Sequence, residues 1–179
     1  MAILPIQLLG QGVLREAARP VEQFDDELRA FVHDLYETMD TALGVGLAAN
    51  QVGRAIRVAV IDADDRRFAM VNPVIVERSG TTAAGEEGCL SIPDLYGEVT
   101  RPERITLEAH DEHGGPFRLE LEGLVARAVQ HEIDHLDGVL FIDYLSALKR
   151  QLAVARWKRD HKDMGPTWTP SPEESEATS

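Results

Sequence analysis

A helical segment that contains two histidines four residues apart constrains the fold of this chain more than any other feature. Residues 131–135 read HEIDH, and they lie in an expected helix of about residues 124–136 that Gly138 ends. Positions i and i+4 of a helix share a face, so this helix has one mainly apolar stripe. The stripe contains Leu124, Ala128, His131 and His135. Because buried imidazoles need polar partners, the rest of the chain has to fold around this helix and supply them.

Histidines with this spacing are typical of a metal site. Two imidazoles on one helix face converge on a single ion, while Glu132 lies ~100° around the helix, close enough to touch a metal-bound water without being a ligand. Metal-assisted hydrolysis needs this combination of ligands and a carboxylate that moves protons. A helix with two surface histidines is the alternative, and the apolar stripe argues against it.

The third ligand decides the class of hydrolase, because catalytic zinc sites commonly have three protein ligands. One large group of zinc proteases places His or Asp six residues after the second histidine, where this chain has Phe141. Another group uses a downstream Glu, but no Glu occurs between Glu132 and Glu173. The remaining soft ligand is Cys89, the only cysteine, in residues 87–91 (EGCLS). Its alternative role is that of a small buried hydrophobic residue.

A glycine-rich stretch at residues 44–51 (GVGLAANQ) superficially fits a dinucleotide-binding fingerprint. That fingerprint requires a strand before it and a helix after it, whereas here a helix is expected before it. We favour close approach of the backbone to a ligand, which glycine permits, with Gln51 offering an amide N–H to a developing oxyanion. A helix end followed by a turn is the structural alternative.

The remaining pattern predicts a mixed fold with short connections. Helices are expected at residues 25–42 and 146–162, and strands at 56–63, 68–77, 105–110 and 117–122. Pro73 donates no amide hydrogen and marks an edge or a bulge, while the last two strands should form an antiparallel hairpin. These elements indicate an α+β fold with antiparallel sheet. Residues 164–179, rich in Pro, Ser, Thr and Glu, are predicted to be disordered.

Charge is distributed unevenly along the chain. The formal net charge is −13, which disfavours DNA as a partner, yet residues 146–163 carry six basic and two acidic side chains. No apolar run reaches the ~20 residues of a membrane helix, and the N-terminal residues lack the basic start and cleavage site of a signal peptide. We therefore expect a cytoplasmic protein without a membrane partner.

Three motifs in this order, GxGxAAxQ, EGCLS and HExDH, resemble those of the bacterial peptide deformylases. They occur at residues 44–51, 87–91 and 131–135, and the similarity extends over about residues 3–163. The resemblance implies a peptide deformylase catalytic domain over residues 1–163. In that domain, antiparallel β-sheets would pack around a central metal-binding helix, and a C-terminal helix would follow.

The resemblance also implies a reaction. A hydrolase of linear amides (EC 3.5.1.88) would remove the N-terminal formyl group from the formyl-methionine of newly synthesised polypeptides and release formate. The implied metal ligands are Cys89, His131 and His135. A metal-bound water would be the nucleophile, Glu132 would be the general acid/base, and Gln51 with the backbone N–H of Leu90 would form the oxyanion hole.

Substrate and metal preferences follow from the same resemblance. The residues expected around the substrate are Val45, Gly46, Gly88, Leu124 and Ala128. Ligand softness favours zinc for a Cys-His-His site, whereas the family implies one Fe²⁺ per chain, which Zn²⁺, Ni²⁺ or Co²⁺ can replace; we expect Fe²⁺. Glu87 and Arg101 are expected to form an ion pair that supports the cysteine loop.

The basic segment 146–163 corresponds to the helix with which bacterial deformylases dock on the ribosome near the exit tunnel. Phosphates of rRNA suit its charge, and a solvated charged face is the alternative. Two other functions remain open at this point. A metallopeptidase on the same helix motif is disfavoured by the missing downstream ligand, and a non-catalytic, metal-containing ribosome-associated factor is disfavoured by Glu132, which a structural site does not need.

Overall fold

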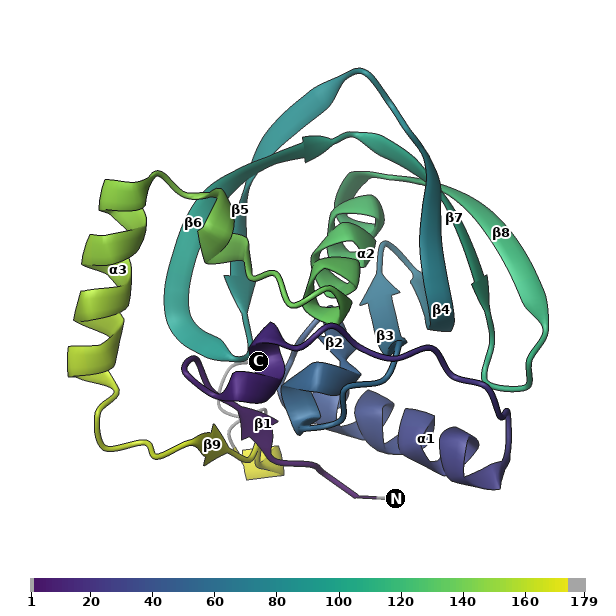
Figure 1. Ribbon diagram of the computed structural model, residues 1–179, viewed down its shortest axis with the longest axis horizontal. Coiled ribbons are helices and arrows are strands. Elements are labelled where there is room, and N and C mark those ends of the chain that lie inside the picture. The colour runs from purple at the N-terminus through teal and green to yellow at the C-terminus, as the bar shows by residue number, and fades with distance from the viewer. Residues whose placement is uncertain (1, 174–179) are drawn as a thin grey trace.

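The computed structural model describes residues 2–173 and has helix α2 (Gly123–Leu136) at its centre (Figure 1). Antiparallel strands lie on both sides of α2, and two further helices, α1 (Asp26–Thr41) and α3 (Ala147–Asp160), lie outside them. The expected α+β architecture, with antiparallel sheets around a central helix and a C-terminal helix, is therefore confirmed. No helix within residues 2–173 is both long enough and apolar enough to span a bilayer.

The largest sheet has five antiparallel strands in the order β2-β3-β4-β7-β8. Its strands are β2 (Gly46–Ala48), β3 (Val58–Ala63), β4 (Arg66–Arg78), β7 (Arg104–His110) and β8 (Pro116–Glu122). The predicted hairpin is β7–β8, and the register of β4 against β7 shifts between Val71 and Val74, around Pro73. Proline lacks the N–H that a regular ladder requires, so the strand continues past it only with this irregularity.

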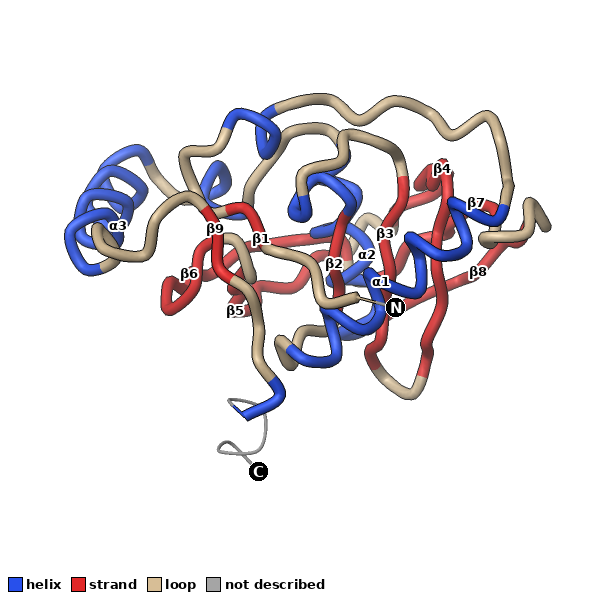
Figure 2. Tube along the Cα trace, turned by 90° about the horizontal axis from the view of Figure 1, so that it is seen from below, coloured by secondary structure: helices blue, strands red, loops and turns tan. Residues whose placement is uncertain are grey.

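Two smaller sheets complete the fold. Strands β5 (Thr82–Cys89) and β6 (Ile92–Pro102) form a long hairpin beside α2, and β1 (Ile6–Gln7) pairs with β9 (Thr167–Trp168). Short 3-10 helices occur at Gly12–Arg15, Ala49–Val52 and Phe141–Tyr144. Figure 2 shows β1 and β9 crossing the same side of the molecule, although they are far apart in the chain.

The central sheet is covered on both faces, which places α2 inside the protein. One face of β3, including Ile61, packs in a core cluster with Val129 and Leu136 of α2. Val60 on the other face packs against Leu35 of α1. A strand with both faces covered is buried almost throughout, and the helix between the two sheets is equally enclosed, so the functional side chains of α2 point into protein rather than solvent.

The prediction of disorder for residues 164–179 is wrong where the structure describes them. Thr167 and Trp168 form β9, and the Trp168 ring packs against a core cluster that contains Leu8, Ile92 and Phe141. One large aromatic ring buries enough apolar surface to order a short polar segment. Residues 174–179 lie outside the described part of the chain.

Candidate metal centre

Helix α2 holds both motif histidines in the core. His131 and His135 are 8 % and 1 % exposed, and their ring centroids lie 4.9 Å apart. The helix ends where Gly138, at φ +76°, allows its N–H to bond the His135 carbonyl at 3.0 Å. A Cβ at this glycine would lie 2.6 Å from the carbonyl oxygen of Arg15. The helix end that carries His135 therefore packs directly on backbone from the N-terminal region.

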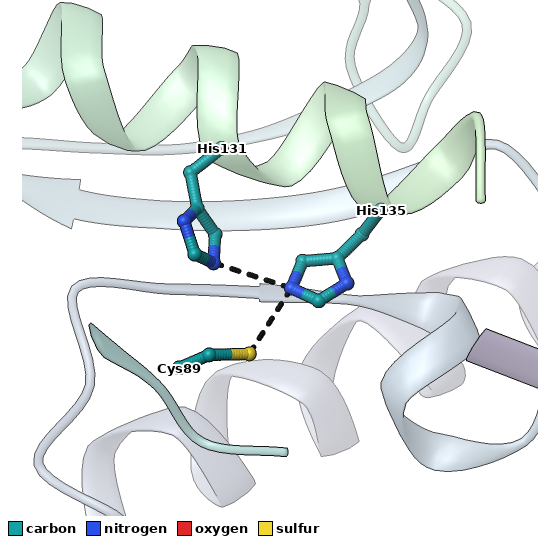
Figure 3. A group of neighbouring side chains, drawn as sticks. All are labelled: Cys89, His131 and His135. Carbon is teal, nitrogen blue, oxygen red and sulfur yellow. Dashed lines mark hydrogen bonds between the residues drawn. The ribbon is translucent and has the colours of Figure 1, made fainter. Parts of the chain in front are cut away.

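Cys89 reaches the histidines from the opposite side, at the end of β5 (Figure 3). Its Sγ lies 3.3 Å from Nε2 of His135, which in turn lies 3.2 Å from Nε2 of His131. The three candidate ligand atoms all lie within 4.8 Å of one another. Cys89 of β5 is 42 and 46 residues before the two histidines of α2 in the sequence, yet the fold brings the three ligand atoms close together.

This donor set fits a divalent metal ion. In a tetrahedral site with metal–nitrogen bonds of about 2.0–2.1 Å and a metal–sulfur bond of about 2.3 Å, two nitrogens lie roughly 3.3 Å apart and a nitrogen and sulfur roughly 3.6 Å apart. The observed separations of 3.2 Å and 3.3 Å are close to these values. Three protein ligands leave one position for water or substrate, as in catalytic sites.

Glu87 orients one of the candidate ligands. Its Oε1 lies 2.9 Å from Nδ1 of His131, so this ring donates from Nδ1 and leaves the lone pair of Nε2 for a metal. Arg101 donates to both oxygens of Glu87, from Nε at 2.6 Å and from Nη2 at 2.9 Å, which is the expected ion pair. Burial alone would raise the pKa of Glu87, yet the hydrogen bonds from Arg101 and His131 lower it to about 2.

Glu132 lies beside this centre without a polar partner among residues 2–173. It is 4 % exposed, and its Oε2 is buried with no hydrogen bond in that range. Burial raises the pKa of Glu132 to about 7. Gly46 of β2 leaves the room that this carboxylate occupies, since a Cβ there would lie 2.7 Å from Oε1. An unpaired carboxyl group that titrates near neutrality suits proton transfer.

Gln51 lies on the other side of the cysteine. Its Oε1 accepts from the Ala48 N–H at 2.9 Å, and its Nε2 donates to Ser91 Oγ at 3.2 Å and lies 3.5 Å from Cys89 Sγ. The glycine-rich stretch that was expected to approach a ligand therefore runs past the centre as β2 and the 3-10 helix that follows it. The Gln51 amide lies next to the Cys89 sulfur, and Leu90 is the residue that follows this cysteine.

A cleft of about 410 Å³ opens over these groups. It is lined by all five residues expected around the substrate, Val45, Gly46, Gly88, Leu124 and Ala128, and by Gln51, Cys89, Leu90, His131 and Glu132. A larger hollow of about 760 Å³ lies between β4, β7 and β8, but its lining is mostly charged and includes none of the candidate ligands. The smaller cleft is therefore the one that belongs to the site.

Two residues of this region were not found from the sequence. Arg127 of α2 donates to Glu87 Oε2 at 2.7 Å and to the Val99 carbonyl at 2.9 Å, and Trp168 lines the cleft from β9. Arg127 is a charged residue in an otherwise apolar stretch of α2, which could have indicated a buried partner. Trp168 stands in a polar segment, and nothing near it in sequence indicates the site.

Comparison with known proteins agrees with this geometry. A family model described as polypeptide deformylase matches residues 3–151. The chain belongs to the peptide deformylase family. It is 47 % identical over 164 residues to a peptide deformylase of Brucella suis, covering 89 % of this chain and 94 % of that one. It is 52 % identical over 155 residues to a deformylase of Alkalilimnicola ehrlichii, covering 84 % and 86 %.

Solved deformylase structures share the fold over almost their whole length. The deformylase of Legionella pneumophila superposes with a TM-score of 0.85 at 44 % identity, covering 90 % of this chain and 96 % of that chain. The deformylase of Ehrlichia chaffeensis in complex with actinonin gives a TM-score of 0.87 at 35 % identity, covering 89 % and 98 %. The three deformylase motifs meet at the candidate centre of this chain. The cysteine motif and the histidine motif supply the candidate ligands, the histidine motif also supplies Glu132, and the glycine-rich motif supplies the Gln51 amide.

Proposed function

We propose that Cys89, His131 and His135 hold the metal ion with which this deformylase works, and that Glu132 moves the protons. The chain is a metal-dependent hydrolase that removes the N-terminal formyl group of formyl-methionine from new polypeptides and releases formate. The observation that carries the proposal is the meeting of three ligand atoms within 4.8 Å beside a buried, unpaired carboxylate.

We further propose Fe²⁺ as the resident ion, one per chain, with Zn²⁺, Ni²⁺ or Co²⁺ able to replace it. The donor set accepts any of these ions, since imidazole and thiolate suit several first-row metals. When bound, the ion lowers the pKa of a water molecule towards neutrality and polarises the formyl carbonyl. Metal analysis after anaerobic purification, with activity compared against a zinc-loaded sample, tests the choice of iron.

The protein groups around the ion have separate roles in this proposal. Glu132 takes a proton from the attacking water and passes it to the leaving amine, a task that a pKa of about 7 suits. The Nε2 amide of Gln51 and the backbone N–H of Leu90 donate to the oxyanion that develops on the formyl oxygen. Glu87, through its bond to His131, keeps that ring in the ligating tautomer.

The methionine side chain is held by the apolar part of the cleft. Val45 and Leu124 are 44 % and 47 % exposed there, although both are apolar. Ala128, about one turn of α2 before the first histidine, lines the same cleft with a small side chain, and Gly46 and Gly88 let the substrate backbone approach closely. An unbranched thioether fits such an irregular apolar space well.

Formate release from formyl-Met-Ala tests the proposal. The purified chain should release formate, and Glu132→Ala should keep its metal but lose about 10²–10⁴-fold in kcat, the usual contribution of a general acid/base. Cleavage of an internal peptide bond, or formate release by Glu132→Ala at the wild-type rate, would contradict it. The metallopeptidase alternative has no downstream ligand, because Phe141 stacks on the His131 ring at 6.2 Å instead.

Helix α3 is the part of the chain that we propose to dock on the ribosome near the exit tunnel. Its basic side chains face solvent together with Leu148 and Leu152, which are 66 % and 62 % exposed, and only Trp157 is buried. A cytoplasmic location follows, because nascent chains leave bacterial ribosomes there. Replacing Lys149, Arg156 and Arg159 by alanine should weaken ribosome binding, with a shallower salt dependence, and leave formate release unchanged; equal affinity would contradict the docking role.

A further inference from the structure

We infer that Trp168, at the C-terminal strand β9, is a positioning residue of the active site: its indole N–H holds the carbonyl of Leu90 and so fixes the residue whose own N–H faces the reaction. The Trp168 Nε1 donates to the Leu90 carbonyl oxygen at 2.8 Å across 78 residues of sequence. The inference rests on the role proposed above for Leu90.

Strand β9 is anchored independently of the tryptophan side chain. Its backbone pairs with β1 in the register Ile6 with Trp168 and Gln7 with Thr167. The N–H of Leu8 adds a bond to the carbonyl of Pro166 at 2.9 Å. Both figures of the whole chain show β9 alongside β1 (Figures 1 and 2). The indole therefore extends from a backbone that is already held by the N-terminal strand.

The turn that follows the metal-binding cysteine is held from three sides. Cys89 and Ile92 are paired, so Leu90 and Ser91 form the tip between β5 and β6. The Leu90 carbonyl accepts from Trp168, and the Ser91 carbonyl accepts from the Leu9 N–H at 2.9 Å. The Ser91 hydroxyl accepts from Gln51 at 3.2 Å. One side is thus held by Trp168 of β9, the second by Leu9, two residues after β1, and the third by Gln51.

The position of this turn matters because the Leu90 N–H can donate to the oxyanion, as proposed above, only when it points towards it. An N–H donor stabilises a developing oxyanion when it is already aimed at it, and a misplacement of ~1 Å can cost about a hundredfold in rate. With the Leu90 carbonyl fixed, rotation about the backbone bonds of Leu90 is restricted. The Trp168 ring, which is half-buried, lines the cleft at the same place.

The chain offers a matched control for the indole N–H. It contains two tryptophans, and the second, Trp157 of α3, also donates from Nε1 to a backbone carbonyl, that of Pro93, at 2.8 Å. Both rings pack in the same core cluster. Trp157 does not line the cleft. Trp168→Phe and Trp157→Phe therefore remove equivalent hydrogen bonds while each keeps an aromatic ring.

The test compares kcat, KM, metal content and urea stability of the two variants on formyl-Met-Ala. Trp168→Phe should lower kcat about two- to tenfold, the effect of one hydrogen bond on the transition state, with KM and metal content unchanged. Trp157→Phe should lose comparable stability at the wild-type kcat. Equal kcat values in the two variants would overturn the inference, because the bond would then be structural only. A wild-type chain that releases no formate would refute the proposed function as well.

Discussion

Replacing Arg101 with alanine would leave Glu87, the carboxylate behind the proposed metal ligand His131, with a single arginine partner. The side chains of Arg101 and Glu87 are only 5 % and 4 % exposed, and they form a two-pronged ion pair at 2.6 Å and 2.9 Å. Arg101 also donates to Asp134 at 2.9 Å. After the substitution, Arg127 alone would balance a charge that cannot reach water.

The size of the effect follows from this burial. Removing one partner of a buried pair typically costs about 3–5 kcal/mol. Burial alone would raise the pKa of Glu87, but the bonds from Arg101 and His131 lower it from 4.5 to about 2, which corresponds to about 3 kcal/mol. Since Arg127 remains, we expect Arg101→Ala to lower the free energy of unfolding by about 3 kcal/mol.

The pH dependence has a definite sign. Because the pKa of Glu87 is lower in the folded chain, its contribution to stability is complete above pH 4.5 and is lost as the pH falls towards about 2. Arg101→Ala should therefore show a smaller loss of stability between these two pH values than the wild-type chain does.

Urea unfolding at pH 7 and competition with a chelator measure the two consequences of Arg101→Ala. Metal affinity should fall about 10–100-fold, the usual effect of losing a group that orients a ligand. The control is Arg118→Ala, which breaks a 2.7 Å pair with Glu108 whose side chains are 53 % and 49 % exposed; screening by solvent keeps its cost below about 1 kcal/mol. Equal stability losses in the two variants, or unchanged metal affinity in Arg101→Ala, would refute the reasoning.

Three further substitutions test separate parts of the molecule. Cys89→Ala removes one ligand of three, so metal analysis should show a chain without bound metal and formate release should be lost. Gly46→Ala places a Cβ 2.7 Å from Glu132 Oε1 and should lower kcat about a hundredfold, whereas Gly80→Ala, whose Cβ meets nothing within 4 Å, should not. Asp25→Ala removes the N-cap of α1 and should cost about 1 kcal/mol in urea unfolding at unchanged kcat.

The parts of the site that the sequence predicts are those encoded by local patterns. Histidine spacing on a helix predicts that His131 and His135 share a face, and the apolar stripe around them predicts burial, as α2 shows. The elimination of other ligands leads to Cys89, and the structure places its sulfur 3.3 Å from His135. Short-range periodicity needs no knowledge of the rest of the chain, so the shared face and the burial of the two histidines are predicted correctly; Cys89 follows from elimination instead.

The β5–β6 hairpin shows why other parts could not be predicted. Residues 82–89 read TAAGEEGC, and alanine, glycine and glutamate are all depleted in strands. The strand exists because β6 pairs with it and α2 packs beside it, with Arg127 of α2 bonding the Ala83 carbonyl at 2.9 Å. Such stabilisation depends on contacts between distant residues, which no local pattern records.

Trp168 shows the same limit at the other end of the chain. The composition of its neighbours is that of a segment too polar to fold alone. Its partners, Ile6 in register and Leu90 through the indole, lie in different parts of the sequence. The sequence of such a segment predicts disorder, because the contacts that order it are made with residues far away in the chain.

The pairing of β1 with β9 can form only after the segments between them, which include the three candidate ligands, have been synthesised. Translation makes β1 before the three candidate metal ligands and β9 after them, and domains acquire their native contacts as the chain emerges. Every candidate metal ligand is made while β1 still lacks its partner strand. A growing copy of the chain therefore carries all three candidate ligands before it carries β9, the strand whose tryptophan bonds the turn beside them.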